Sequence, residues 1–251
     1  MKNKNIIKLL EDYKLSRISI EQVLDYIKKS EKILNLDFAQ IDLYREQRTL
    51  IPEIIYCENK TIKQILSIIK NTLNQKDIVI GTRCSEEKLK KIKSKYPEGK
   101  YSFDGRAFYI NKKKIKKLKG KVALISAGST DIPVCEEAAI VLEALGVEYN
   151  KFFDIGVAGI HRLFSKAEEI NRCDVLIVAA GMEGALPSVI GGIFSQPIIA
   201  IPTSIGYGTA LNGFTALFAM LTSCSPGVTV VNINNGVGAA AAAIKILNLL
   251  N

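Results

Sequence analysis

Residues 174–203, DVLIVAAGMEGALPSVIGGIFSQPIIAIPT, predict a strand, a helix and a second strand in direct succession. Both strand segments, DVLIVAAG and PIIAIPT, are continuously apolar, which is typical of parallel strands covered on both faces. The same alternation continues on either side. Further strands are expected at 121–128, 151–157 and 227–233, and helices at 132–146, 161–173, 185–194, 211–223 and 238–250. The C-terminal half is therefore predicted to be a three-layer α/β domain around a parallel sheet.

Charge separates this half from the rest of the chain. Lys and Arg outnumber Asp and Glu by 28 to 15 in residues 1–120, and are outnumbered 6 to 10 in residues 121–251. We therefore expect a smaller basic N-terminal domain at 1–119 and the sheet domain at 120–251.

The N-terminal half also alternates between helices and strands. Two amphipathic packing helices are expected within 3–35, helices at 61–73 and 85–95, and strands at 77–82 and 101–110, which together indicate a small α/β domain. The lysine run NKKKIKKLKG (111–120) is interpreted as a solvated linker rather than a nucleic-acid patch, because it lacks interleaved aromatic residues.

Composition excludes several classes of protein. No apolar stretch is long and uninterrupted enough to be a convincing membrane span, and no signal peptide is recognised. Five cysteines without CxxC spacing indicate reduced thiols of a cytoplasmic protein. With one histidine and scattered cysteines, the chain is not expected to hold a zinc site.

Ligands of parallel sheets bind at the carboxyl ends of the strands, where the glycine-rich loops of this chain fall. The first loop, SAGSTD (126–131), combines small residues with a strand-to-helix turn that favours an anion. Its predicted binding residues are Ser126, Gly128, Ser129, Thr130 and Asp131. Helix capping by Thr130 or Asp131 is an equally good explanation of the motif.

Three further loops carry polar groups at this rim. Glu183 follows Gly181 and Met182 at the end of an apolar strand and is a candidate acid or base, with helix capping as the alternative. His161 is a candidate proton shuttle or a surface residue, and Arg162 suits a phosphate or carboxylate. The exit loop of the fourth strand offers the binding hydroxyls of Thr203 and Tyr207.

A lone cysteine stands in the turn LTSCSPGV (221–228), between an apolar helix and an apolar strand. Cys224 is our candidate covalent nucleophile, and the alternative is a small buried hydrophobe. We expect Cys224 and Glu183 to open on the same rim of the sheet.

Together these motifs resemble the LarB family of pyridinium-3,5-biscarboxylic acid mononucleotide synthases, which begin assembly of a nickel-pincer nucleotide cofactor. The resemblance runs through SAGSTDIPVCEEAA, DIGVAGIHRL, GMEGALPSVIGG, IPTSIGYG and SCSPGVTVVNINNGVGAAAAA, and includes DLYREQRTLIPEIIY (42–56). The C-terminal half is more distantly similar to the aminoimidazole ribonucleotide carboxylases, which implies a flavodoxin-like fold.

The resemblance implies a function. A LarB-type enzyme carboxylates nicotinic acid adenine dinucleotide with CO2 or bicarbonate through a cysteinyl adduct, cleaves the phosphoanhydride to release AMP, requires Mg²⁺ and forms a homo-octamer. It implies that Cys224 is the nucleophile, with Glu183 near the ring, and that Asp42, Arg45 and Arg48 complete the pyrophosphate or adenylate end. One departure is Asn234, where the family pattern has Asp.

Two other functions compete with this one. A purine-type carboxylase or mutase would need the histidine that Ala185 replaces, and at the final proline turn it would carry a methionine rather than Cys224. A nucleotide- or RNA-binding protein would use the basic N-terminal half, and salt-dependent retention on nucleic acid would indicate it.

Overall fold

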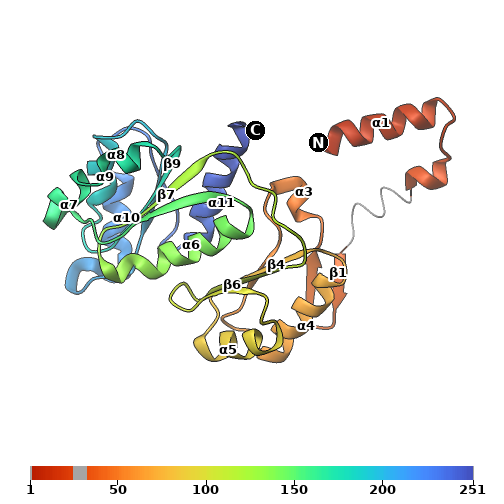
Figure 1. The fold of residues 1–251 in the computed structure, drawn as a ribbon, viewed down its shortest axis with the longest axis horizontal. Helices are drawn as coiled ribbons and strands as arrows, with labels where there is room; N and C mark the ends of the chain where they lie inside the picture. The colour runs from red at the N-terminus through yellow and green to blue at the C-terminus, as the bar shows by residue number, and fades with distance from the viewer. Residues whose placement is uncertain (1, 25–32, 251) are drawn as a thin grey trace.

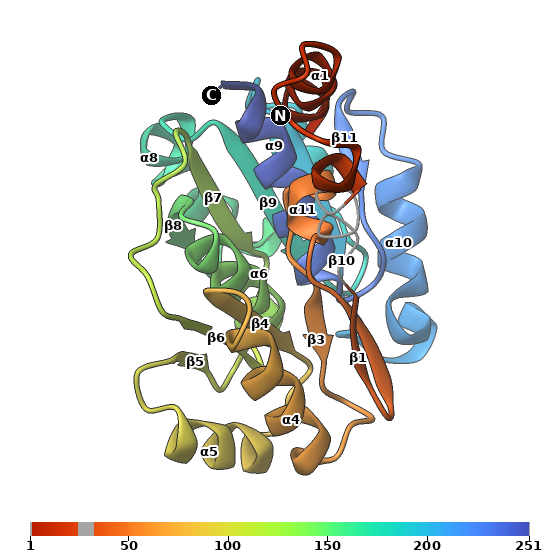
Figure 2. The same cartoon turned by 90° about the vertical axis from the view of Figure 1, so that its right-hand side faces the viewer.

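The computed structural model describes residues 2–24 and 33–250. Two sheets lie on opposite sides of helix α6 (Ile132–Ala144), which packs against both, as Figures 1 and 2 show. Within the described residues, no helix is long and apolar enough to cross a membrane.

The C-terminal half is built on five parallel strands in the order β11-β10-β9-β7-β8. Their bounds are β7 Lys121–Ser126, β8 Glu148–Phe152, β9 Val175–Ala180, β10 Ile198–Pro202 and β11 Val228–Val230. Counted within this half, the order is 5-4-3-1-2, which is the flavodoxin-like doubly wound arrangement. The predicted fold class is confirmed.

Helices cover both faces of this sheet, so that β7 is buried on both sides (Figure 1). Val122 and Leu124 face α6 and α11, whereas Ala123 and Ile125 face the helices of the other layer. The remaining helices are α7 Ile160–Phe164, α8 Ala167–Asn171, α9 Leu186–Gly191, α10 Phe214–Leu221 and α11 Gly236–Leu247.

Three elements of this half differ most from the sequence prediction. The second strand is 148–152 rather than 151–157, because 148–152 pair with 121–125 and the chain turns at Asp154 (φ 57°). The helix expected at 161–173 is two short helices, since Ser165 and Lys166 end one and begin the next. The helix expected from residue 211 begins at Phe214, after a 3-10 segment containing two residues with positive φ.

The N-terminal half carries a mixed four-stranded sheet in the order β3-β4-β6-β5 and a separate β1-β2 hairpin. The bounds are α1 Lys2–Lys14, β1 Ile33–Leu36, β2 Ala39–Asp42, α3 Arg45–Thr49, β3 Ile54–Tyr56, α4 Ile62–Leu73, β4 Ile78–Thr82, α5 Glu86–Lys95, β5 Lys100–Ser102 and β6 Ala107–Asn111. Thr61 and Ser85 accept backbone hydrogen bonds at the starts of α4 and α5, which explains where these predicted helices begin.

The segment 101–110 is a β5-β6 hairpin rather than one strand. Its turn contains Gly105, which packs so tightly on α6 that a Cβ would lie 2.6 Å from the carbonyl carbon of Glu136. One face of the mixed sheet, including Ile80 and Tyr109, packs on α6, while Val79 faces α4 and α5. The two halves therefore share one apolar core.

The chain's amino end departs from expectation. The apolar residues Ile7, Leu10 and Tyr13 of α1 are exposed, so this helix does not bury the face that its pattern suggested for packing. Part of the second expected helix lies outside the described residues, and its last positions belong to β1.

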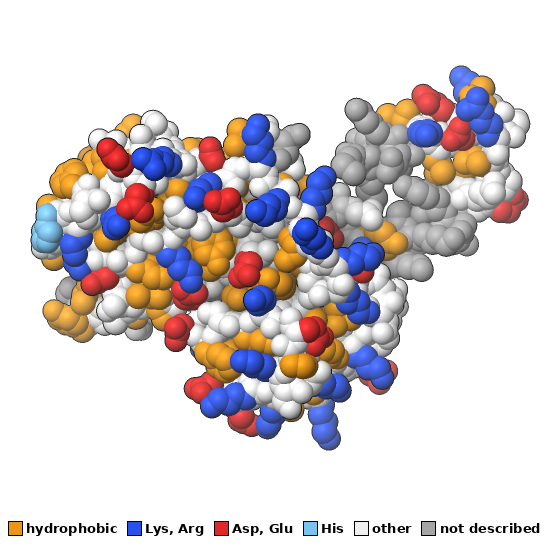
Figure 3. Space-filling model, viewed as in Figure 1, with side chains coloured by type: hydrophobic (Ala, Val, Ile, Leu, Met, Phe, Trp, Pro, Cys, Tyr) orange, Lys and Arg blue, Asp and Glu red, His pale blue; other side chains and the backbone are white. Residues whose placement is uncertain are grey.

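The lysine run connects the two sheets, and the expected domain boundary at 119/120 falls between β6 and β7. Leu118 donates its N–H to the carbonyl of Gly146, and the φ of +78° at Gly146 lets the end of α6 approach the run closely. Lys and Arg side chains are scattered over the surface around α4 and α5 in the lower part of Figure 3.

Candidate active site

The loops at the carboxyl ends of the five strands interlock through their backbones. Met182 donates its N–H to the carbonyl of Ile205, and Asn234 donates its N–H to that of Pro202. Asp154 donates its N–H to Ser126 Oγ at 3.0 Å. The predicted motif loops therefore meet at one rim, as expected of a doubly wound sheet.

Three of the predicted polar binding residues, Ser126, Asp131 and Thr203, are buried in this framework. Asp131 accepts hydrogen bonds from the Gly128 N–H at 2.9 Å and from Thr203 Oγ1 at 2.6 Å. Burial raises the pKa of Asp131, and the bonds from Thr203 and Gly128 oppose that shift. The hydroxyl of Ser126 accepts the N–H of Asp154 and so fixes the loop that follows β8. The carboxylate of Asp131 therefore closes the turn before α6 but does not cap that helix, and contact of these three residues with substrate stays a prediction.

Other predicted residues face solvent at the same rim. Ser129, Thr130, Met182, Glu183 and Tyr207 are exposed, with Tyr207 at 82%. Glu183 does not cap the following helix, because the N-cap of α9 is Ala185 and no side chain caps it. Its carboxylate is placed where a ligand on the rim can meet it.

His161 and Arg162 stand on α7, beyond the edge strand β8. Arg162 forms an ion pair with Asp154, with 2.8 Å between Nη1 and Oδ2, and His161 is exposed. Both residues therefore lie beside the edge strand β8, and β11 is the edge strand on the other side of the sheet.

Cys224 lies at the other end of the sheet from Glu183, contrary to our expectation. It precedes β11, whose first residue, Val228, pairs with Ile198 at the start of β10. Its neighbour Ser225 donates a hydrogen bond to the carbonyl of Ser188 in α9. In a parallel sheet the loops that enter strands and the loops that leave them lie at opposite ends, and Cys224 is in an entry loop.

The thiol of Cys224 is nevertheless accessible. Cys224 is exposed, whereas Cys57, Cys84, Cys135 and Cys173 are buried. The alternative that Cys224 is a small buried hydrophobe is therefore wrong within this chain.

Asn234 has a clear structural role where the resembled family has Asp. Its φ of +56° is left-handed, a conformation that Asn tolerates better than most residues. Its side chain accepts the N–H of Ser204 at 2.9 Å and donates to Ser204 Oγ at 2.8 Å. This amide ties the exit of β11 to the exit of β10.

Sequence reasoning missed an ion pair that joins the two halves. Arg83, which follows β4, lies 3.0 Å through Nε from Oε1 of Glu137 on α6, and also hydrogen bonds to the carbonyl of Asn234. Glu137 Oε2 accepts the N–H of Gly236 at the start of α11. Burial raises the pKa of Glu137, and Arg83 opposes that shift. The signal was present, since the segment IPVCEEAAIVLEA is otherwise so apolar that an acid within it is expected to be buried and paired.

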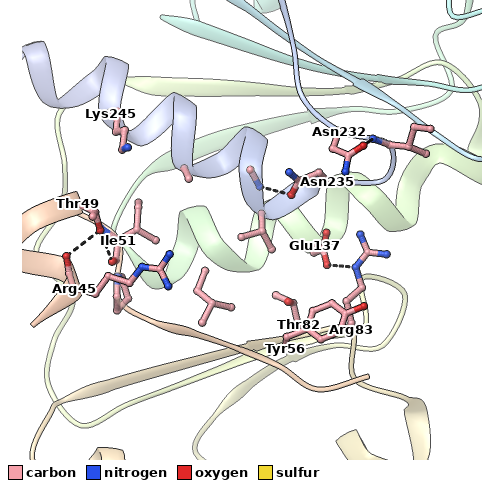
Figure 4. Close-up of a pocket in the computed structure, with 16 residues that line it drawn as sticks. Arg45, Thr49, Ile51, Tyr56, Thr82, Arg83, Glu137, Asn232, Asn235 and Lys245 are labelled. Carbon is pink, nitrogen blue, oxygen red and sulfur yellow. Dashed lines mark hydrogen bonds and ion pairs between the residues drawn. The ribbon is translucent and has the colours of Figure 1, made fainter. Parts of the chain in front are cut away.

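An open cavity of about 710 Å³ lies between the halves, beside this ion pair (Figure 4). Its walls come from α3, β3, the end of β4 and one face of α11. A smaller cavity of about 210 Å³ adjoins it, shares Arg83 and Glu137, and contains Thr130, Ser204 and Arg106. The interdomain cavity therefore continues toward the rim.

The N-terminal motif residues separate in space. Arg45 lines the interdomain cavity, whereas Arg48 is ion-paired with Asp42, which holds the pKa of that carboxyl below its usual range. Asp42 and Arg48 border a different surface pocket. Asp42, Arg45 and Arg48 therefore do not form the single cluster that we expected: Arg45 lines the interdomain cavity, and the other two form an ion pair.

The described residues provide no ready-made magnesium cage. No group of three or more His, Cys, Asp and Glu side chains among residues 2–24 and 33–250 is arranged to hold a metal ion. The acidic residue lining the interdomain cavity, Glu137, is occupied by Arg83 and the start of α11. The Mg²⁺ requirement stays a prediction.

Comparison with known proteins shows the family. Residues 33–113 match the LarB/PurE-like N-terminal domain, and residues 121–251 match the AIR carboxylase family. The chain belongs to the LarB family. LarB-type membership supports a carboxylase- or mutase-type enzyme.

Three individual proteins are among those similar to this chain. A Methanocaldococcus jannaschii protein whose name states no activity is 37% identical over 99% of both chains. An N5-carboxyaminoimidazole ribonucleotide mutase of the same organism is 33% identical over 51% of this chain and 79% of its own. A crystal structure of a Treponema denticola PurE2 variant has a TM-score of 0.44 at 23% identity, covering 52% of this chain and 81% of that chain.

Proposed function

We propose that this LarB-family protein carboxylates the pyridinium ring of nicotinic acid adenine dinucleotide and releases AMP, giving pyridinium-3,5-biscarboxylic acid mononucleotide. The observation that carries the proposal is the exposed thiol of Cys224 in a carboxylase-type fold, while four other cysteines are buried. An aminoimidazole is electron-rich and attacks CO2 unaided, whereas a pyridinium ring must first accept a nucleophile.

The chemistry divides into balanced steps. The Cys224 thiolate adds to ring C4, and the bonding pair neutralises the cationic ring as a dihydropyridine. The enamine carbon then attacks CO2 and forms the new carbon–carbon bond. Glu183 takes the proton from that carbon, and expulsion of the thiolate restores the aromatic cation. Hydrolysis of the phosphoanhydride by water completes the reaction and releases AMP.

The strand register supports a site that is built from two copies of the chain, because Cys224 lies in the loop that enters β11 and Glu183 in the loop that leaves β9. Val228 pairs with Ile198, four residues before the rim end of β10, so the two ends of the sheet are separated by about 13 Å at the usual strand rise. A base must come within about 3 Å of the proton that it removes. We therefore assign the thiol of each site to a neighbouring copy.

The surface beside Cys224 supports this assembly. Four apolar side chains on and before α10 share one stripe and are 50–62% exposed: Leu211, Phe214, Phe218 and Leu221. The stripe runs from the rim toward the loop that holds Cys224. A second copy packed on it would bury the stripe and bring its own rim toward the thiol. The proposed assembly is the homo-octamer implied by the family.

Other rim groups have supporting roles in the proposal. Ser129, Thr130 and the backbone around Gly128 and Gly181 would bind the ribose phosphate. His161 and Arg162 would bind the carboxylate or move a proton at the edge of the site, and Tyr207 would cover the ring.

Mass spectrometry of the products tests the function directly. The full-length protein is incubated with nicotinic acid adenine dinucleotide, ¹³C-bicarbonate and Mg²⁺, and a mononucleotide carrying one labelled carboxyl group should appear together with AMP. A Cys224→Ser control should form neither the labelled product nor an adduct. Labelled product from that control would refute covalent catalysis.

A second candidate rests on the named relatives. Several N5-carboxyaminoimidazole ribonucleotide mutases match the C-terminal half, so mutase activity on that substrate is the alternative. Ala185 stands where the purine enzymes have a histidine, which weighs against it. Turnover of N5-carboxyaminoimidazole ribonucleotide, unaffected by Cys224→Ser, would establish the mutase instead.

A further inference from the structure

The position of Glu183 is set by the backbone of its own turn. Within the described part of the chain, no hydrogen bond or ion pair holds its side chain. Its two neighbours, Met182 and Gly184, both have left-handed backbones, with φ values of 51° and 66°. Gly184 donates its N–H to the carbonyl of Gly181 at 2.9 Å and so closes the turn that carries Glu183. A shift of this turn would therefore move the carboxylate directly.

The turn is anchored on the loop that leaves β10. Met182 donates its N–H to the carbonyl of Ile205 at 2.8 Å, and a Cβ on Gly181 would lie 2.5 Å from the same oxygen. Ser204, the residue before Ile205, is held in turn by the side chain of Asn234, which bonds its N–H and its hydroxyl. The loops that leave β9, β10 and β11 therefore form one connected unit.

Arg83 attaches the N-terminal half to this unit. Its guanidinium donates through Nη2 to the carbonyl of Asn234 and lies 3.0 Å through Nε from Oε1 of Glu137. Glu137 also accepts the N–H of Gly236 at the start of α11. Figure 4 shows Arg83 pointing toward Glu137 across the interdomain space. One side chain therefore links the end of β4, helix α6 and the exit of β11.

Backbone strain follows the same route. Arg83, Asn234 and Met182 have φ values of 53°, 56° and 51°, in a region that residues other than glycine seldom adopt. Such conformations persist only where the surrounding structure fixes them, and they concentrate at functional sites. The three strained residues lie in succession along the hydrogen-bonded path that runs from the interdomain contact to Glu183.

We infer that Arg83 is a positioning residue for Glu183, and that the N-terminal half contributes to the reaction by holding the rim through this side chain. The inference rests on the proposed function for the role of Glu183 as proton acceptor. The planar fork of an arginine donates to Glu137 and Asn234 at the same time, whereas the ammonium of a lysine is a single point. Loss of the second bond frees the exit of β11 and, through the loop that leaves β10, lets the Glu183 turn shift.

Arg83→Lys tests the inference, because it keeps a cation beside Glu137 and should keep the fold. With nicotinic acid adenine dinucleotide as substrate, kcat should fall about tenfold to a hundredfold with little change in KM, since displacement of the base affects proton removal more than binding. The dihydropyridine-like absorbance expected for Glu183→Gln should accumulate here too. Lys151→Ala, which removes the ion-pair partner of Glu136 on the same helix, should leave kcat unchanged.

Two changes at Asn234 test the middle of the path. Asn234→Ala removes both bonds to Ser204 and should reproduce the kinetics of Arg83→Lys. Asn234→Asp should keep kcat near that of the wild type, because its carboxylate can accept both the N–H and the hydroxyl of Ser204, and Asp tolerates the left-handed backbone. Wild-type kcat in Asn234→Ala would contradict the path.

Amide hydrogen exchange tests the path without turnover. In Arg83→Lys the peptides covering 180–184 and 204–208 should exchange faster than in the wild type, whereas α4 should be unaffected. Faster exchange there, with no carboxylated product from the wild type, would uphold the positioning of Glu183 and refute the proposed function. Unchanged exchange, or an unchanged kcat in a protein that does form the product, would overturn the inference and leave the proposed function standing.

Discussion

Mixing two inactive variants would reveal whether the site is built from two chains. Cys224→Ala removes the proposed nucleophile and Glu183→Gln removes the proposed proton acceptor, and both side chains are exposed, so neither change should disturb the fold. Cys224→Ala alone should give no carboxylated product, and Glu183→Gln alone should give little.

The register of the sheet sets the expected result of the mixture. The two ends of the sheet are about 13 Å apart in one chain, a distance that no single pyridine ring with a base at about 3 Å can bridge. If each site takes its thiol from one chain and its glutamate from a neighbour, random assembly of an equal mixture makes about a quarter of the sites intact. The mixture should therefore recover about a quarter of wild-type activity.

The assay measures ¹³C-labelled product after the two variants are co-expressed with different tags and purified through both. An oligomer of Cys224→Ala carrying both tags serves as the control and should stay inactive. A mixed oligomer no more active than its parents would refute the assignment of the thiol to a neighbouring copy.

Four further outcomes follow from the same structure. A thiol reagent should modify Cys224 alone in the native protein and all five cysteines after denaturation, as counted by mass spectrometry. Glu183→Gln should accumulate a dihydropyridine-like absorbance with little product, because thiolate addition needs no base whereas proton removal does; an unchanged yield would exclude the role. Glu137→Ala should lower the free energy of unfolding by about 3 kcal/mol in urea titrations, since it leaves Arg83 without its partner, and Glu136→Ala should cost less because its ion pair is more exposed. Burial raises the pKa of Tyr149 to about 12, so stability present below about pH 10, where the unfolded tyrosine begins to ionise, should fall as the pH rises toward 12; Tyr149→Phe should abolish that part of the decline.

Local sequence was sufficient for the C-terminal fold. Continuous apolar runs such as 175–180 and 198–202 cannot be buried except as covered parallel strands, and glycines close the turns between them. Local sequence was less informative where two elements lie within one apolar segment. Residues 101–110 were therefore expected to form a single strand, although they belong to the β5-β6 hairpin. The tight approach of Gly105 to α6 explains that turn, and such an approach exists only after folding.

By itself the sequence determined the sheet, the rim loops and the resemblance to one family, because each depends on residues close together in the chain. The tertiary structure alone decided that Cys224 stands in the loop that enters β11 while Glu183 follows β9, that Arg83 pairs with Glu137, and that Lys245 and Arg45 line one cavity. These relations join segments far apart in the chain, and a charge pattern cannot specify which acid meets which base. The direction of each strand fixes the end of the sheet at which a side chain lies, and packing on α6 fixes which face of that helix is buried. Together they decide which acid and which base can meet.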